Sequence, residues 1–194
     1  MNRFVWVLLL SATVACSKKQ THLPATKENP YAGYTEYLIP AKQHYATNNV
    51  YQTIDKKELH FTAIFDSSCI YTNNNAENAY DINKLYGFSD CGSLHHENSA
   101  RVGWLWNGKM IELYAYCYTN GIRKSALLGT TLIGTPAELS ISIQPNQYLF
   151  TCNGSKTTLQ RHCNSSNILG YKLYPYFGGN ETAPHDIHVF IKES

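Results

Sequence analysis

Beyond its first 15 residues the sequence lacks any apolar run long enough to cross a bilayer, which takes about 20 residues. It also lacks the sustained 3.6-residue periodicity of amphipathic helices, and it contains no internal repeat. Its formal net charge is only +2, so there is no basic field for nucleic acid, and nucleic acid is not a predicted partner. No two cysteines have the Cys-x-x-Cys spacing, which argues against a zinc knuckle.

The start of the chain has the order of a secretory signal. Arg3 precedes the apolar run FVWVLLL at 4–10, and small residues lead to Ala15 and Cys16. A cysteine directly after a small residue at the cut site resembles the lipobox of bacterial lipoproteins, in which the cysteine is lipidated, commonly with palmitate. The alternative is an ordinary cleaved signal with an incidental cysteine. The resemblance implies a signal peptide at 1–15, lipid on Cys16 and a membrane anchor. Ser17 is not the Asp of an inner-membrane retention signal, which favours the outer membrane.

Polar residues with two prolines fill residues 16–34, which predicts a flexible lipidated tether. From residue 35 to 194, short runs rich in Tyr, Ile, Leu, Val and Thr alternate with Gly, Asn, Pro and Ser, which predicts strands. The predicted strands are 35–39, 59–65, 99–106, 110–118, 124–132, 138–143, 147–152, 156–160, 171–177 and 187–191. Asn-Gly pairs at 107, 120 and 153 predict hairpin turns, and 41–57 is a short helix or a long loop. This pattern predicts one antiparallel β-sandwich of jelly-roll type over 35–194.

The cysteines after Cys16 are odd in number. They are Cys69, Cys91, Cys117, Cys152 and Cys163. Because an exported chain enters an oxidising compartment, disulfides are expected, and at least one thiol is left over or pairs with another molecule. The spacing does not determine the connectivity. We expect Cys69–Cys91 first and a second pair among the other three.

Alternation along the predicted strand 110–118 separates two sets of side chains, because successive residues point to opposite faces. The set predicted to face the core is Ile111, Leu113, Ala115 and Cys117. The other set is a stripe of tyrosines with one carboxylate: Glu112, Tyr114, Tyr116 and Tyr118. With Tyr174 and Tyr176, these tyrosines are the predicted ligand-binding residues, since aromatic faces stack on sugars. The alternative is that a second layer covers the rings as part of the core. In 187–191 the same logic places Ile187, Val189 and Ile191 inward, and His188 and Phe190 outward.

Several polar residues are candidates for chemistry. His95, His96 and Glu97 precede a predicted strand; in a loop they could share a metal, although a purely hydrogen-bonding role is the alternative and no metal site is predicted. Glu97 and Glu112 are the candidate carboxylate pair for glycoside hydrolysis, unless they are surface groups or pair with arginines. Arg101, Tyr116 and His188 supply the residue types for β-elimination on a uronic acid: Arg neutralises the carboxylate, and Tyr or His moves the proton.

Two stretches, GFSDC at 87–91 continuing to 104 and YFGGN at 176–180 continuing to 187, carry a wider resemblance. They resemble uncharacterised lipoproteins and secreted proteins of Bacteroidetes-type bacteria. The strand order and the ending also resemble, more loosely, concanavalin-like jelly rolls, which include lectins, glucanases and alginate-type lyases. The sequence departs from the glucanases, whose acidic strand is reduced here to Glu112, and from the lyases, whose Gln-x-His strand and terminal lysine are absent.

We therefore expect a lipid-anchored glycan-binding module at the cell envelope, with a polysaccharide as its ligand and no cofactor. A polysaccharide-cleaving enzyme, lyase before hydrolase, is the first alternative. A structural or assembly lipoprotein is the second.

Overall fold

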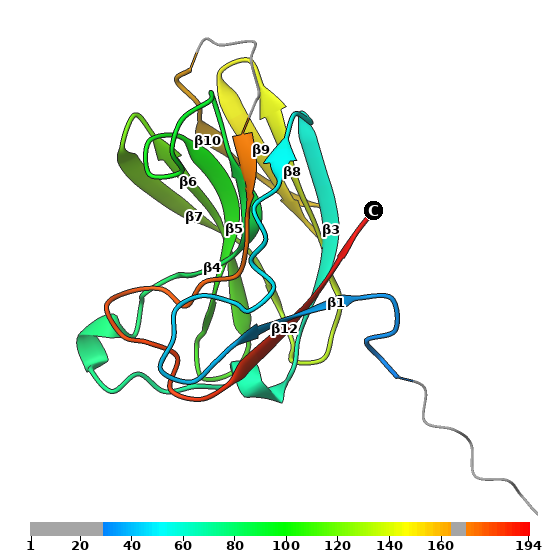
Figure 1. Ribbon diagram of the computed structural model, residues 1–194, viewed down its shortest axis with the longest axis vertical. Helices are drawn as coiled ribbons and strands as arrows, with labels where there is room; N and C mark the ends of the chain where they lie inside the picture. Colours follow the sequence, from blue (N-terminus) through cyan, green and yellow to red (C-terminus); the bar gives the residue numbers. More distant parts are fainter. Residues whose placement is uncertain (1–28, 164–169) are drawn as a thin grey trace, which may run out of the picture. The chain divides into compact units, whose positions relative to one another are not determined.

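The computed structural model describes residues 29–163 and 170–194 (Figure 1). The expected signal peptide at 1–15, Cys16 and the tether up to residue 28 lie outside the described residues. Residues 31–194 form one structural unit. Its described helices are two three-residue 3₁₀ turns, η1 (Ser67–Cys69) and η2 (Ala76–Asn78), and neither is long and apolar enough to cross a membrane.

Strands dominate the described chain and form two six-stranded antiparallel sheets, which confirms the predicted all-β sandwich (Figure 1). The first sheet has the order β1 (Thr35–Ile39), β12 (Ile187–Glu193), β3 (Glu58–Phe65), β8 (Ala137–Gln144), β9 (Gln147–Cys152) and β10 (Ser155–Gln160). The second sheet has the order β2 (Thr53–Ile54), β11 (Gly170–Leu173), β4 (Asn83–Ser89), β5 (Ser99–Trp106), β6 (Ile111–Thr119) and β7 (Ile122–Thr131).

The core lies between the two sheets and follows the predicted alternation. All four apolar residues of β6 are fully buried: Ile111, Leu113, Ala115 and Cys117. In β12, the predicted inward residues Ile187, Val189 and Ile191 are also part of the core. Phe190 points to the outer face of the first sheet, where the ring of Tyr31 stacks on it with centroids 3.8 Å apart. The Asn-Gly pairs at 120 and 153 have positive φ at both residues, as a type I′ hairpin turn requires.

Residues 41–57 contain no helix and form the long loop, one of the two predicted alternatives; this stretch includes the two-residue strand β2. Two other segments differ from the predictions. The predicted strand 171–177 stops at Leu173, and Pro175 follows, which has no N–H for a sheet ladder. Strand β4 was not predicted, because Asn83, Lys84 and Gly87 interrupt any apolar alternation. It forms because β11 and β5 pair with it on both sides.

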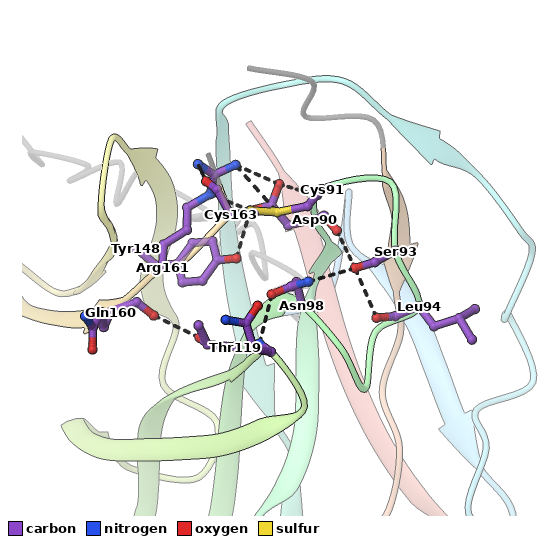
Figure 2. Close-up of a disulfide and its surroundings, with 11 residues drawn as sticks. Asp90, Cys91, Ser93, Leu94, Asn98, Thr119, Tyr148, Gln160, Arg161 and Cys163 are labelled. Carbon is purple, nitrogen blue, oxygen red and sulfur yellow. Dashed lines mark hydrogen bonds and ion pairs between the residues drawn. A yellow bond between two sulfur atoms is a disulfide. The ribbon is translucent and has the colours of Figure 1, made fainter. Parts of the chain in front are cut away.

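A buried ion pair joins the ends of the two sheets (Figure 2). Asp90 directly follows β4 and is fully buried, whereas Arg161 directly follows β10. Arg161 Nε donates to Asp90 Oδ2 at 2.6 Å and its Nη2 donates to Oδ1 at 3.2 Å. Tyr148 of β9 donates its hydroxyl to Oδ2 at 2.8 Å, and the backbone N–H of Cys91 donates to Oδ1 at 2.7 Å. Charged hydrogen bonds of this kind are the strong ones, so this network fixes one sheet against the other.

The disulfide lies in the same place and corrects the expected pairing. Cys91 is bonded to Cys163, not to Cys69, and the second expected pair is not formed among the described cysteines. Cys69 is buried in η1, which packs against β12, and its thiol donates to the carbonyl of His188 at 3.4 Å. The bridge closes a sequence separation of 72 residues, which corresponds to about 4 kcal/mol of chain-entropy stabilisation.

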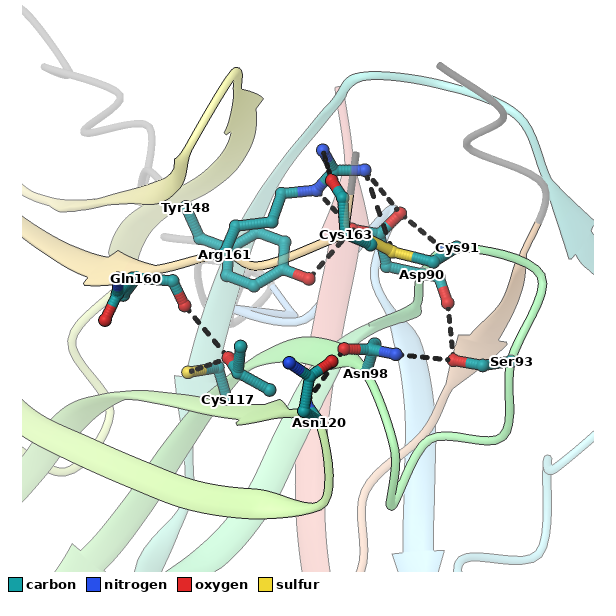
Figure 3. A network of polar contacts seen from close by, with 11 residues as sticks. Asp90, Cys91, Ser93, Asn98, Cys117, Asn120, Tyr148, Gln160, Arg161 and Cys163 are labelled. Carbon is teal, nitrogen blue, oxygen red and sulfur yellow. Dashed lines mark hydrogen bonds and ion pairs between the residues drawn. A yellow bond between two sulfur atoms is a disulfide. The ribbon is translucent and has the colours of Figure 1, made fainter. Parts of the chain in front are cut away.

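The polar network also holds the loop between β4 and β5. Asn98 donates to the hydroxyl of Ser93 at 3.1 Å and accepts the N–H of Asn120 at 3.1 Å (Figure 3). The N–H of Gly121 donates to the carbonyl of Glu97 at 3.0 Å. The β4–β5 loop is therefore fixed at Asp90 by the ion pair and near its other end by the β6–β7 turn.

We expect Asp90→Asn to lower the free energy of unfolding by about 3–5 kcal/mol, because it removes the negative charge from a buried pair. Urea unfolding with the disulfide intact measures this loss. The matched control is Glu58→Gln, which removes a carboxylate from an exposed contact with His60 and should change stability by less than about 1 kcal/mol. Equal effects from both variants would contradict the structural role of Asp90.

Candidate functional site

A groove of about 530 Å³ lies on the outer face of the second sheet. That volume is within the range of small-ligand sites, roughly 300–1,000 Å³. Strands β4, β5, β6, β7 and β11 form its floor, and three loops, β1–β2, β4–β5 and β11–β12, form its rim. Its floor exists because β5 and β6 alternate: their core residues point inward and the intervening side chains point into the groove.

Arg101 is part of this floor. It stands on β5 between two core residues, opposite Tyr116 of β6, and is half-buried. Burial of the guanidinium lowers the pKa of Arg101 to about 10. Within the described residues, its Nε has no hydrogen-bond partner and no carboxylate forms an ion pair with it. Because desolvated charges are normally paired, this side chain could accept an anion.

Aromatic rings surround Arg101 in an almost continuous series, which we call the aromatic belt. Its members, in spatial order, are Tyr45, Tyr176, Tyr116, Tyr118, His96, His95, Tyr171 and Tyr51. Adjacent ring centroids are 4.9 Å apart for Tyr45–Tyr176, 6.0 Å for Tyr116–Tyr118, 5.2 Å for Tyr118–His96, 4.2 Å for His96–His95, 6.1 Å for His95–Tyr171 and 5.6 Å for Tyr171–Tyr51. The hydroxyls of four of these tyrosines are close enough to influence the charge on Arg101.

Lys84 bridges the one gap in the belt. Its ammonium lies 5.3 Å from the ring centroid of Tyr116 and 5.8 Å from that of Tyr176, and it donates to the carbonyl of Ile82 at 2.9 Å. Burial, and then the positive charges of Arg101 and Arg123, lower the pKa of Lys84 to about 8. The groove thus contains a second partly desolvated cation beside the first.

His95 is held by one phenol. The hydroxyl oxygen of Tyr171 accepts the backbone N–H of His95 at 3.1 Å and lies 2.8 Å from its Nδ1. Burial, followed by the charge of Arg101, lowers the pKa of His95 to about 4, so the imidazole is neutral at pH 7. A neutral, oriented imidazole can exchange a hydrogen bond or a proton with a ligand.

Glycine makes room for the floor. Opposite Arg101 on β4 stands Gly87, where a Cβ would lie 2.1 Å from the carbonyl oxygen of Ala100 and 2.6 Å from the Cα of Arg101. Only glycine therefore fits on β4 at the position opposite Arg101.

The structure brings together many, but not all, of the predicted site residues. The groove is lined by His95, His96, Arg101, Tyr116, Tyr118, Tyr174 and Tyr176. Tyr114 lies outside this lining and donates its hydroxyl to Glu112 at 2.5 Å. Glu97 is in the β4–β5 loop and also outside the lining. His188 lies on the first sheet, 2.5 Å from Glu36, and so does not meet Arg101 and Tyr116.

Among the lining residues that sequence reasoning missed are three tyrosines and three cations: Tyr45, Tyr51, Tyr171, Lys84, Arg123 and Lys172. Tyr45 and Tyr51 stand in a loop without periodicity, and Lys84 stands in the unpredicted β4. The lining is strongly one-sided in charge. It includes Lys84, Arg101, Arg123 and Lys172, and it contains no Asp or Glu among the described residues.

No family model and no curated protein matches the chain. Among solved structures, the alginate lyase AlyC3 is similar at 10% identity, covering 83% of this chain and 74% of that one, with a TM-score of 0.55. The family 7 alginate lyase A1-II′ is 9% identical, with 84% of this chain and 80% of that one covered and a TM-score of 0.51. The catalytic domain of an endo-1,3-β-glucanase (laminarinase) from Thermotoga petrophila is 11% identical, with 84% of this chain and 76% of that one covered and a TM-score of 0.51. The chain spans 57% of the length of a GH16 endo-β-1,3(4)-glucanase that it also matches. The likenesses to the two alginate lyases and the laminarinase, with TM-scores above 0.5, show the jelly-roll fold.

We expect Lys84 to titrate with a midpoint near pH 8, so that the groove loses positive charge as the pH rises through 8. Arg101→Gln should move this midpoint upward, because it removes a neighbouring positive charge that disfavours the ammonium form. NMR titration of the lysine side chains, with Lys84→Arg used to assign the resonance, measures both values. A midpoint that does not respond to Arg101→Gln would contradict their proximity.

Proposed function

We propose that the protein is an exported, lipid-anchored module of the cell envelope whose groove binds an acidic polysaccharide. The observation that carries this proposal is the half-buried guanidinium of Arg101, whose Nε has no hydrogen-bond partner in the described chain and which lines the same groove as the tyrosines of the aromatic belt. A sugar carboxylate would supply the missing counter-charge, and a guanidinium can bind it through two parallel hydrogen bonds. The tyrosine rings would stack on the apolar faces of the sugars.

The charge of the lining argues for an acidic glycan over a neutral one. A neutral sugar would leave Arg101 desolvated without a counter-ion, which is unfavourable. The absence of Asp and Glu from the described lining means that nothing there repels a polyanion. Two of the structurally similar proteins are alginate lyases, and alginate is an acidic polysaccharide, which agrees with this choice.

A second candidate function is cleavage of that polysaccharide by β-elimination. The observation that favours it is the presence in one groove of a guanidinium, the phenol of Tyr116 and the neutral imidazole of His95. His95 would take the role that the sequence suggested for His188. Hydrolysis has less support, because it needs two carboxylates and neither Glu97 nor Glu112 lines the groove. A purely structural role has less support as well, since it gives no reason for an aromatic groove around a buried cation.

We expect Arg101→Gln to weaken binding of polygalacturonate or alginate roughly thirtyfold or more, as for loss of one partner of a buried charge pair. The same variant should be at least as stable as the parent protein, because it removes an uncompensated buried charge. Calorimetry and thermal unfolding measure the two effects. Lys109→Gln, in the exposed β5–β6 turn, is the control for the loss of one positive charge.

The outcomes separate the candidates. Equal binding of the acidic polymers and of a neutral glucan, unaffected by Arg101→Gln, would overturn the proposal. If the acidic polymer is bound and unsaturated uronosyl ends accumulate, as seen by their ultraviolet absorption, the function is that of a lyase. If the polymer is bound and stays intact, the function is binding alone.

For the membrane anchor, we expect Cys16→Ser to move the protein from the membrane fraction to the soluble fraction of the envelope and to abolish incorporation of labelled palmitate. Several acyl chains bury enough CH₂ groups, at about 0.8 kcal/mol each, to make a stable anchor. Cys69→Ser, which changes a buried thiol elsewhere in the chain, is the control. Lipid labelling that persists in Cys16→Ser would refute the assignment.

A further inference from the structure

Two members of the aromatic belt, Tyr45 and Tyr51, differ from the rest. Tyr45 is 61% exposed and Tyr51 is 72% exposed, whereas Tyr116 in the floor is only 3% exposed. Both stand on the β1–β2 loop, and both line the groove. Exposed aromatic rings that line a groove are typical of a ligand-binding surface, because a bound ligand removes them from water.

Backbone contacts fix the chain at or beside both tyrosines, and each ring has one aromatic neighbour. Tyr45 forms a β-bridge with Tyr176, and its ring meets that of Tyr176 edge to face. Near Tyr51, the N–H of Lys172 donates to the carbonyl of Gln52 at 2.8 Å. The ring of Tyr51 lies 5.6 Å from that of Tyr171. Rigid aromatic anchors of this kind contribute to binding at little entropic cost.

The two rings are backed by opposite ends of strand β4. Tyr176 forms a bridge with Lys84 near the start of β4, and the N–H of Tyr171 donates to the hydroxyl of Ser89 at its end. Five residues of strand separate these positions, which corresponds to roughly 16 Å at the usual rise per residue. A single sugar ring cannot contact both tyrosines. Arg101, paired through β5 with Gly87, lies between the two ends.

We propose that Tyr45 and Tyr51 are two sugar-stacking subsites, so that the groove takes a linear chain of several sugar units lying along β4 with an acidic unit on Arg101. This inference rests on the proposed function and specifies its ligand: an acidic oligosaccharide long enough to reach both rings, rather than a monosaccharide. The two subsites contribute contact area, whereas Arg101 contributes the selection for charge.

The test is a calorimetric series of oligogalacturonates and alginate oligosaccharides of increasing length with the purified protein. Affinity should rise with length until the chain reaches both rings and should then level off. Tyr45→Ala and Tyr51→Ala should each weaken the long oligosaccharides about three- to tenfold and leave the shortest one that binds unchanged. Tyr45→Phe and Tyr51→Phe should retain most of the affinity. Tyr80→Ala is the control, since Tyr80 is 86% exposed and does not line the groove.

The results distinguish this inference from the proposed function. Affinity that is independent of length, or equal losses for short and long chains in the alanine variants, would overturn the two subsites. If Arg101→Gln still weakened binding in that case, the proposal of an acidic ligand would stand. Length-dependent, tyrosine-dependent binding of a neutral glucan without an effect of Arg101→Gln would support the subsites and overturn the acidic ligand. Failure of every oligosaccharide to bind would overturn both.

Discussion

The buried pair between Asp90 and Arg161 is the constraint on which the rest of the structure depends. It joins the end of β4 in one sheet to the end of β10 in the other, and Tyr148 and the Cys91–Cys163 disulfide bind the same point. The β4–β5 loop starts there, carries His95 and His96, and leads directly into β5 with Arg101. The position of this loop at the groove therefore depends on a contact at the end of its sheet.

Arg161 and Arg101 illustrate opposite situations of the same side chain. Arg161 is buried and matched by a carboxylate within the chain, and its charge contributes to stability. Arg101 is half-buried, and no described carboxylate forms an ion pair with it. Tyrosines, Lys84 and His95 are its neighbours instead. A cation without a counter-charge in the described chain is a local departure from the usual pairing of charges.

The fold could be predicted from the sequence because its determinants are local. Alternation in residues 110–118 and 187–191 gave the core faces, and the Asn-Gly pairs gave the turns, since both depend on residues close together in the chain. Strand β4 could not be predicted, because its residues become a strand only through pairing with β11 and β5. The predicted disulfide pairing was wrong for the same reason. Cys91 and Cys163 come together only when the two sheets pack, and the spacing of cysteines in the sequence does not show which of them meet.

The candidate site likewise contains residues that could be predicted from local sequence and residues that could not. Tyr116 and Tyr118 were predicted because they share a strand face. Lys84, Tyr45 and Tyr51 could not be, because they enter the groove from an unpredicted strand and an irregular loop. Arg101 was predicted as a candidate from its residue type, whereas its position in the groove without a counter-charge in the described chain follows only from the packing of β4, β6 and β11 around it.

The stacking of Tyr31 on Phe190 has a consequence for the first sheet. Phe190 faces outward from this sheet, yet it is only 8% exposed, with the ring of Tyr31 stacked on it. The residues just before β1 thus shield an apolar side chain from water on the sheet that does not carry the groove.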